Sequence, residues 1–320
     1  MSLTLPSKAY RPFQYPWAYD FWERQQQIHW LPSEISLADD IKEFNKLDQV
    51  KRSLVVNVFR MFVQADIDVL NCYHRVYARH FKPTEVQMML TAFSNMETVH
   101  VAAYSHLLDS LGLPETEYHA FLEYVEMKAK HDFMESFDPQ DGPEGVALSL
   151  AGVSAFGEGT QLFASFAILL NFPRQNLLKG MGQIVSWSVR DESLHCEGIA
   201  RLFHAYVAEK GNFIDRARLS RKIRAMAELV VATEDKFVDL VFAGGDVPGL
   251  SAGELKQYIR FMIDLRLRQL GEAPIYEIGR NPLPWVDGMA VGIEHANFFE
   301  RQGTEYSKGA TAGDWSDVFS

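Results

Sequence analysis

Apolar residues recur every three to four positions through most of this chain, and this period constrains the fold more than any other feature. No segment shows the alternation of apolar and polar residues that marks a half-buried strand. The expected helical segments are residues 45–80, 84–111, 114–136, 144–171, 174–208, 217–242 and 252–270. Long helices joined by short turns indicate an all-α long-helix bundle, in which facing helices can hold a cofactor between them.

The two ends of the chain interrupt the helical pattern. Residues 1–35 are rich in proline and aromatic residues, and we expect an irregular segment that lies on the surface of the helical core. Residues 301–320 are small, polar and rich in glycine, which is typical of a flexible tail. Because no linker divides what lies between, the sequence predicts one domain over residues 1–300 followed by that tail.

Composition narrows the class of protein and its partners. With 47% hydrophobic and 23% charged residues, the chain has the composition of a folded globular protein. Its formal net charge of -11, without any run dense in Lys or Arg, argues against binding to nucleic acid or to an anionic membrane. There is no signal-peptide pattern and no apolar stretch of the roughly 20 residues that span a bilayer. Cys72 and Cys196 lie far apart, so we expect no disulfide framework and a reducing, cytoplasmic location.

Two Glu-x-x-His motifs carry the chemistry of this sequence. In the stretch SNMETVHVAAYSHLL, Glu97 and His100 share one face of an otherwise apolar helix, and Tyr104 lies one turn further along. The stretch RDESLHCEG repeats the spacing with Glu192 and His195. Burying a carboxylate and an imidazole is costly unless a charge compensates, and a metal ion is the usual compensation. A single motif of this kind is most often a surface pair, but two in a buried register indicate a metal site.

Two further carboxylates fall in the apolar register of other helices. Asp66 lies among the core positions of its segment, whereas Asp68 points roughly 200° away, toward solvent or a neighbouring helix. Glu158 lies in the apolar stripe of segment 144–171. The predicted metal ligands are Asp66, Glu97, His100, Glu158, Glu192 and His195. Four carboxylates and two imidazoles balance two divalent ions, and such an oxygen-rich set suits iron or manganese better than zinc or copper.

These motifs resemble a known family, the small radical-generating β subunit of class I ribonucleotide reductase, and the similarity runs over residues 12–300. METVHVAAY resembles the family's Glu-x-x-His-x-x-x-Tyr, VRDESLH its Arg-Asp-Glu-x-x-His, and GEGTQLFASFA its third metal-binding helix. Asp66 also precedes Glu97 at the interval of the family's first ligand. The resemblance implies a ferritin-like bundle with two metal ions, iron foremost, while Mn/Mn and Mn/Fe pairs stay open.

The resemblance also implies roles for residues that are not metal ligands. Tyr104 would hold a stable radical, Trp30 would relay electrons to and from the metals, and Asp191 would link His100 to Trp30 through hydrogen bonds. The protein would be a homodimer whose tail, through Tyr306 and the end DWSDVFS, binds the large subunit. The resemblance implies that the ribonucleotide is reduced on that large subunit, and this sequence shows no phosphate-binding Gly loop after a strand.

Some alternatives stay open at this point. Ser188 stands one turn before Glu192, where many iron-tyrosyl members of the family carry an apolar residue, so the metal identity and the activating oxidant are not fixed. One rival function is a ferritin-like di-metal oxidase or oxygenase acting on its own substrate, which would need an open cavity to the metals and no relay through Trp30. The other rival is a non-enzymatic metal-storage bundle, which has no evident use for the aromatic N-terminal segment or the tail.

Overall fold

The computed structural model describes residues 2–9, 11–114, 123–136 and 142–289. Within these ranges the chain is a bundle of helices with no β-strand, and its one β-type contact is an isolated antiparallel bridge between Val247 and Leu250. The all-α prediction is therefore confirmed. The tail predicted over residues 301–320 lies outside the described part of the chain.

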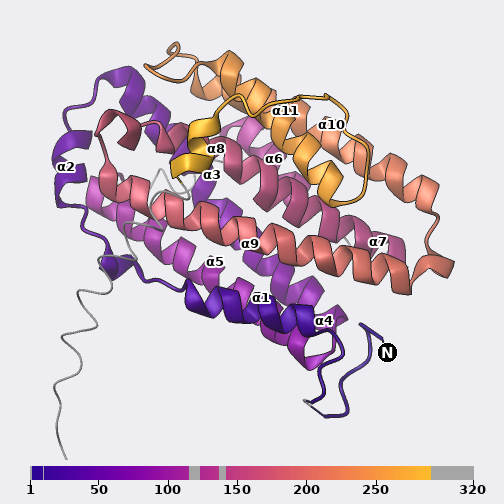
Figure 1. Ribbon diagram of the computed structural model, residues 1–320. Coiled ribbons are helices and arrows are strands. Elements are labelled where there is room, and N and C mark those ends of the chain that lie inside the picture. Colours follow the sequence, from indigo (N-terminus) through magenta and orange to yellow (C-terminus); the bar gives the residue numbers. More distant parts are fainter. Residues whose placement is uncertain (1, 10, 115–122, 137–141, 290–320) are drawn as a thin grey trace, which may run out of the picture.

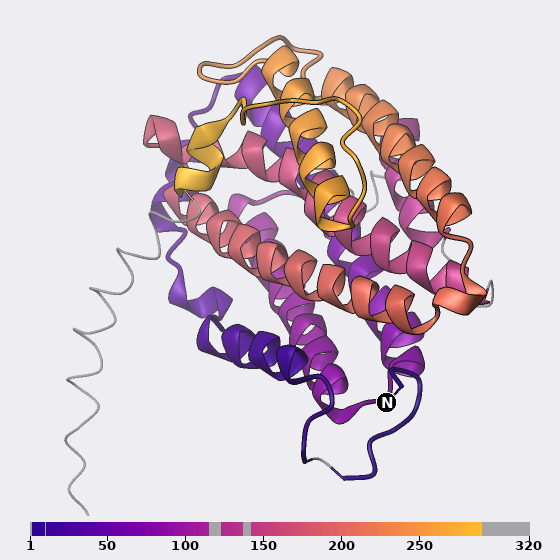
Figure 2. The same cartoon turned by 45° about the vertical axis from the view of Figure 1, so that its right-hand side comes forward.

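Long helices make up the bundle, which Figures 1 and 2 show from two sides. They are α3 (Gln49–Cys72), α5 (Thr84–Leu111), the continuous stretch α7 (Gly142–Ser149), η6 (Leu150–Gln161) and α8 (Leu162–Leu170), then α9 (Lys179–Glu209), α10 (Arg216–Val241) and α11 (Ala252–Gln269). Helix α3 continues through a π-helical turn, η2 (Tyr73–Tyr77), into the short α4 (Ala78–His80). Helix α5 packs against α3 and α9, and η6 packs against α9 and α11. The fully buried core therefore lies between α3, α5, η6 and α9.

The middle of the expected segment 144–171 is π-helical, and glycine makes its close packing possible. A Cβ atom on Gly157 would lie 2.5 Å from Met134 Sδ of α6 (Val125–Glu135), and one on Gly159 would lie 2.5 Å from Arg266 Nε of α11. Arg266 Nε also donates a hydrogen bond to the Gly159 carbonyl at 2.9 Å. The segment is thus helical as predicted, but it forms wider, π-helical turns where α6 and α11 pack against it.

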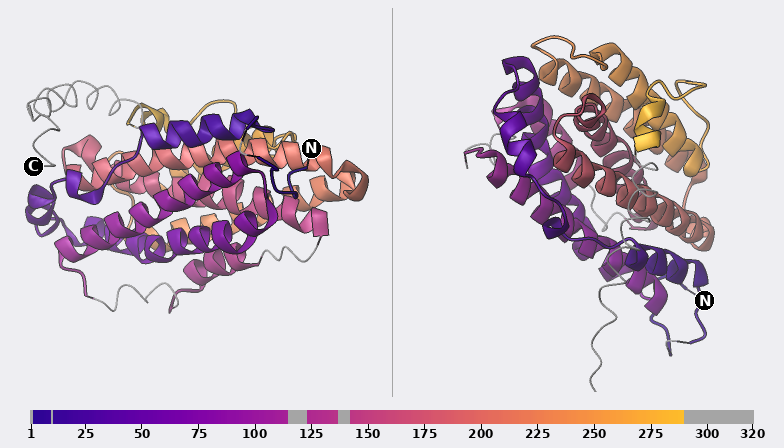
Figure 3. Two further views of the ribbon diagram at one scale, coloured as in Figure 1. Left: turned by 90° about the horizontal axis from the view of Figure 1, so that it is seen from below. Right: turned by 60° about the vertical axis from the view of Figure 1, so that its left-hand side comes forward.

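The prediction of an irregular surface segment over residues 1–35 was wrong in part. Helix α1 (Pro16–Gln27) forms within it and packs along α5 and α9, and the indigo ribbon in Figure 3 shows this helix laid on the bundle. Pro16 stands in the first helical turn, where its missing N–H costs nothing, and neither proline nor glycine interrupts the helix after it. Trp30, beyond α1, is only 1% exposed, so this segment lines the core as well as covering it.

Two other predicted segments differ from the structure near their starts. Tyr124 is extended, so segment 114–136 is not one continuous helix: α6 begins at Val125, and residues 115–122 lie outside the described ranges. Helix α9 begins at Lys179, because the preceding residues form the 3-10 turn η7 (Pro173–Gln175) and then two left-handed positions, Asn176 and Leu178, with φ of 58° and 50°. Left-handed residues stop an α-helix, and apolar periodicity does not reveal them. The short η1 (Pro32–Glu34) and α2 (Ala38–Phe44) connect α1 to α3.

One helical stretch among the described residues, Gly142–Gln175, is long and apolar enough to cross a membrane by length and composition. Its most apolar window is wholly buried inside the protein, as expected of the central helix of a bundle. The apolar character of this stretch is therefore explained by its place in the core.

A buried ion pair joins α6 to α10 and gives a test of the fold. Lys130 Nζ lies 2.9 Å from Glu234 Oε1 and 4.1 Å from the centre of the Phe237 ring, and both charged side chains are fully buried. We expect Lys130→Met alone to lower the free energy of unfolding by about 3–5 kcal/mol, because it leaves a buried, unpaired carboxylate. The double variant Lys130→Met with Glu234→Leu should recover most of that loss in chemical unfolding experiments. Equal losses in the single and double variants would show that packing, not charge, dominates here.

Candidate metal centre

Six buried side chains from four helical segments meet in the middle of the bundle. Asp66 comes from α3, Glu97 and His100 from α5, Glu158 from η6, and Glu192 and His195 from α9; none is more than 2% exposed. The structure thus brings together all six side chains that the sequence pattern selected. Asp68 faces away, as expected, and its Oδ2 lies 2.6 Å from His131 Nδ1 of α6.

Glu97 and Glu192 lie between the two imidazoles and reach both. Nδ1 of His100 is 3.4 Å from Glu97 Oε2 and 3.2 Å from Glu192 Oε1. Nδ1 of His195 is 3.0 Å from Glu97 Oε1 and 3.2 Å from Glu192 Oε2, and 3.6 Å from Glu158 Oε1. Each of the two central carboxylates therefore offers one oxygen to each side of the cluster, the arrangement that bridges a pair of cations.

The unpartnered polar atoms of the cluster fit two divalent cations. The buried atoms without a hydrogen-bond partner include Asp66 Oδ2, both carboxylate oxygens of Glu97 and of Glu192, Glu158 Oε2, and Nδ1 of His100 and of His195. Native proteins rarely leave buried polar groups without a partner. A concentration of such atoms in one place therefore indicates a metal-binding site. They form two groups, Glu97 with Glu158, Glu192 and His195, and Asp66 with Glu97 and His100, in each of which the ligand atoms lie within 4.8 Å of one another.

Burial and the neighbouring charges shift the pKa values of the carboxylates and imidazoles in the cluster. Burial raises the pKa of Asp66 well above its usual range and raises the pKa of Glu158 to about 7. Burial also opposes ionisation of Glu192, but the two imidazoles outweigh it and lower the pKa of Glu192 to about 2. Burial likewise disfavours the charged imidazole of His195, yet the surrounding carboxylates raise its pKa well above the usual range. Protons thus stabilise the crowded carboxylates, and cations that bind here must displace them.

A second set of hydrogen bonds fixes both imidazoles from behind. His100 Nε2 donates to Asp191 Oδ2 at 3.2 Å, and Trp30 Nε1 donates to the same oxygen at 2.8 Å. His195 Nε2 donates to Gln25 Oε1 at 3.2 Å, and Gln25 Nε2 contacts Asp191 Oδ1 at 3.5 Å. Because each Nε2 donates to a partner behind the ring, each Nδ1 faces the cluster, where it can bind a metal once its proton has been displaced.

Sequence analysis missed Gln25, which joins the two halves of this network. It belongs to α1, the helix that the prediction treated as irregular surface, and it is 1% exposed. The signal for it was weak, because a glutamine within the run ERQQQ is ordinarily a solvated residue. Only the packing of α1 against α5 and α9 turns this side chain inward.

Tyr104 lies beside the cluster in a mostly apolar pocket. Its hydroxyl donates to Ser188 Oγ at 3.0 Å, and Ser188 Oγ donates in turn to the Ile184 carbonyl at 3.1 Å. The Phe62 ring packs against Tyr104 with ring centres 4.8 Å apart, and the Tyr104 side chain is 2% exposed. Burial, with the nearby Asp66 carboxylate adding to it, raises the pKa of Tyr104 and keeps the phenol protonated.

A second buried phenol, missed in the sequence, contacts the cluster from the opposite side. Tyr73 of η2 donates its hydroxyl hydrogen to Glu158 Oε1 at 3.1 Å. Its position two turns after Asp66 was a usable signal, but it reads equally well as core packing. Tyr306 lies outside the described residues, so its predicted role stays a prediction.

The fold and the cluster define a class, the ferritin-like bundles that carry carboxylates and histidines on facing core helices. The family model for the ribonucleotide reductase small chain matches residues 7–282. A chain from Invertebrate iridescent virus 3, described as a probable ribonucleoside-diphosphate reductase small subunit, is 38% identical over 96% of this chain and 86% of its own length. The ribonucleoside-diphosphate reductase subunit beta of Chlamydia pneumoniae is 28% identical over 95% of this chain and 90% of its own.

Solved structures agree on the fold. A ribonucleotide reductase subunit from Clostridium botulinum matches with a TM-score of 0.82 at 23% identity, covering 89% of this chain and 91% of its own. The dimanganese(II) NrdF protein of Streptococcus sanguinis matches with a TM-score of 0.76 at 17% identity, covering 90% and 99%. This chain belongs to the ribonucleotide reductase small-chain family. It is thus the small subunit of an oxidoreductase that works with a large subunit.

The cluster predicts a defined metal stoichiometry. We expect close to two iron or manganese ions per chain, measured by elemental analysis after loading and desalting. Glu97→Ala or His195→Ala should abolish tight binding of at least one ion, because each removes a group that faces the shared centre. His106→Ala, an exposed histidine on the same helix as Glu97, is the matched control and should load fully. Full loading of both site variants, or a folded protein that takes up zinc alone, would contradict this assignment.

Proposed function

We propose that this chain generates a tyrosyl radical on Tyr104, from which ribonucleoside-diphosphate reduction is initiated in the large subunit. The observation that carries the proposal is the placement of the Tyr104 phenol, which lies beside the cluster in an apolar pocket and bonds to Ser188, whereas the Tyr73 phenol bonds directly to Glu158. Tyr104 lies one helical turn beyond His100, and its side chain lines a pocket together with Asp66. A radical at this position is next to its source and away from water.

The six cluster residues would hold two metal ions, with iron our first choice and Mn/Mn or Mn/Fe pairs as the alternatives. Glu97 and Glu192 would bridge the pair, since each faces both imidazoles. Asp66 and Glu158 would each complete one side. When bound, such a pair supplies the oxidising power that no ordinary side chain has. The Streptococcus sanguinis neighbour is a dimanganese protein, which keeps manganese a live alternative for this chain.

The surrounding residues orient the phenol and keep water from it. Ser188 accepts the hydrogen bond of Tyr104 and so fixes the direction of the hydroxyl. Phe62 packs on the phenol, and Phe166 packs on Phe62 with ring centres 5.3 Å apart. Because all of these side chains are buried, a radical on Tyr104 would meet few quenching partners.

Electrons would reach the cluster through Trp30 and Asp191. The indole N–H and the His100 N–H donate to the same oxygen of Asp191, which gives an unbroken hydrogen-bonded series from Trp30 to a metal ligand. The Trp30 ring also lies 5.1 Å from the Trp187 ring, centre to centre. We assign Trp30 and Asp191 to this relay, a role that a metal-storage bundle or an oxidase with its own substrate would not need.

The assembly would be a homodimer of this chain with the large subunit, in the cytoplasm. We assign residues 1–300 to the helical domain and residues 301–320 to the tail that binds the large subunit, with Tyr306 passing the radical between subunits. The cytoplasmic location accords with Cys72 and Cys196, which are both free thiols buried in the core. The substrate would bind on the large subunit, and this chain would contribute to deoxyribonucleotide synthesis only in that complex.

The role of Tyr104 is tested by removing a single oxygen atom. Tyr104→Phe keeps the ring, so metal content and fold should match the wild type, while the tyrosyl signal in electron paramagnetic resonance disappears and deoxyribonucleotide formation falls to background. Tyr77→Phe is the matched control, because this buried tyrosine bonds to the Ser149 carbonyl and hydroxyl, away from the six cluster residues, and should leave the signal unchanged. Full reductase activity in Tyr104→Phe would show that the oxidised metals store the oxidising equivalent themselves.

The tail is tested by truncation. A chain ending before Thr304 keeps every cluster residue, so its metal loading and tyrosyl signal should equal those of the full chain. Turnover with the cognate large subunit should be lost, because the tail provides both the docking segment and Tyr306. Undiminished turnover by the truncated chain would refute the assignment.

A further inference from the structure

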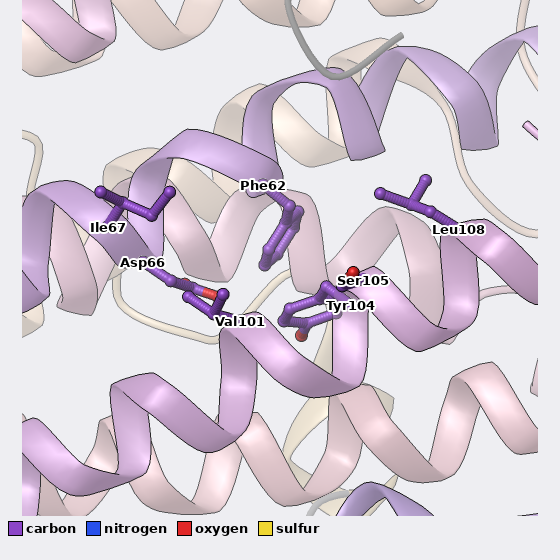
Figure 4. A pocket seen from close by; sticks show the side chains of 7 residues that line it. All are labelled: Phe62, Asp66, Ile67, Val101, Tyr104, Ser105 and Leu108. Carbon is purple, nitrogen blue, oxygen red and sulfur yellow. The ribbon is translucent and has the colours of Figure 1, made fainter. Parts of the chain in front are cut away.

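A pocket between α3 and α5 connects the surface to the cluster. It has a volume of about 140 Å³. Its walls are formed by Phe62, Asp66, Ile67, Val101, Tyr104, Ser105 and Leu108. Figure 4 shows these side chains on two facing helices, with Asp66 on one helix and Tyr104 on the other.

The pocket runs from an accessible rim to a buried end. Ser105 is exposed and Ile67 and Val101 are half-buried, whereas Asp66 and Tyr104 are each 2% exposed. The inner end thus holds one candidate metal ligand and the candidate radical residue. Asp66 Oδ2 is buried and has no hydrogen-bond partner.

The chemistry of the walls selects a small, neutral and apolar molecule. Four of the lining side chains are hydrocarbon, and a water molecule held inside would need two or more polar partners. An anion would lose its hydration on entry and would find only hydrocarbon walls along most of the pocket. An apolar cavity of about 150 Å³ is known to take xenon or benzene, so this pocket has ample room for a diatomic gas.

We infer that this pocket binds dioxygen and is its entry route to the Asp66 side of the cluster. This inference rests on the proposed function, in which an oxygen species activates the metals, and it narrows that oxidant to the neutral molecule. Val101 and Ser105 control access, since they lie on α5 at the rim and neither is a candidate ligand. Superoxide, an anion, is excluded from this route by the same apolar walls.

Xenon tests the pocket without any metal. Crystals of the full, metal-free chain under xenon pressure should show an anomalous peak between Val101 and Tyr104. Val101→Phe fills the space and should abolish the peak, and Ser105→Phe gives the same test at an exposed position that tolerates substitution. Ala102→Phe, exposed on the same helix and outside the pocket, is the control and should retain it. A wild-type pocket without xenon, or one that binds azide as readily, would overturn the inference.

Oxidation kinetics test the entry route. With equal iron(II) loading, the rate at which dioxygen oxidises the metals, followed by stopped-flow absorbance, should fall severalfold in Val101→Phe and Ser105→Phe and stay unchanged in Ala102→Phe. Equal rates in all four proteins would overturn the entry route, whether or not a tyrosyl radical forms. If oxidation depends on the pocket but no tyrosyl radical appears in the wild type, the entry route stands and the proposed role of Tyr104 fails.

Discussion

Mutual repulsion among four buried carboxylates is the constraint on which the rest of this structure depends. Glu97 lies within 4.8 Å of Glu158 and Glu192 on one side of the cluster and of Asp66 on the other, and all four carboxylates are buried. Burial, with the neighbouring carboxylates adding to it, raises the pKa of Asp66 and of Glu158, whereas burial is outweighed at Glu192 by the two imidazoles, which lower its pKa. Packing of the apolar core must hold these side chains together, and long helices provide enough buried apolar surface for that task.

The hydrogen bonds behind the cluster bind the N-terminal helix to the catalytic core. Gln25 of α1 contacts His195 and Asp191, while Trp30, just beyond α1, donates to Asp191. Four helical segments supply the cluster residues, but Gln25 of α1 orients the His195 imidazole and contacts Asp191, which in turn orients the His100 imidazole. Removing α1 would therefore free the His195 ring to rotate and leave Asp191 with less support, even though α1 contributes no residue to the cluster.

The sequence predicted the cluster well because most of its residues are recognised from their spacing within single helices. Glu97 with His100, and Glu192 with His195, are fixed by helical geometry, since residues three apart share a face. The hydrogen bonds that complete the site depend instead on which helices meet. Gln25 turns inward only because α1 packs on the bundle, and Ser188 faces Tyr104 only because α5 and α9 lie side by side. Periodicity contains no information on such pairings, nor on the left-handed residues that delay the start of α9.

The placement of Glu158 depends on how the helices around η6 pack. Glu158 lies in the π-helical η6. π-Helical turns are rare in proteins as a whole, but they often occur at functional sites. Gly157 and Gly159 flank Glu158 and allow α6 and α11 to approach, and Arg266 satisfies the Gly159 carbonyl. A Cβ atom at Gly157 would lie 2.5 Å from Met134 Sδ, and one at Gly159 would lie 2.5 Å from Arg266 Nε, so these side chains fit against η6 only because both positions are glycine. The surroundings of this carboxylate are therefore shaped by α6 and α11, two helices that contribute no side chain to the cluster.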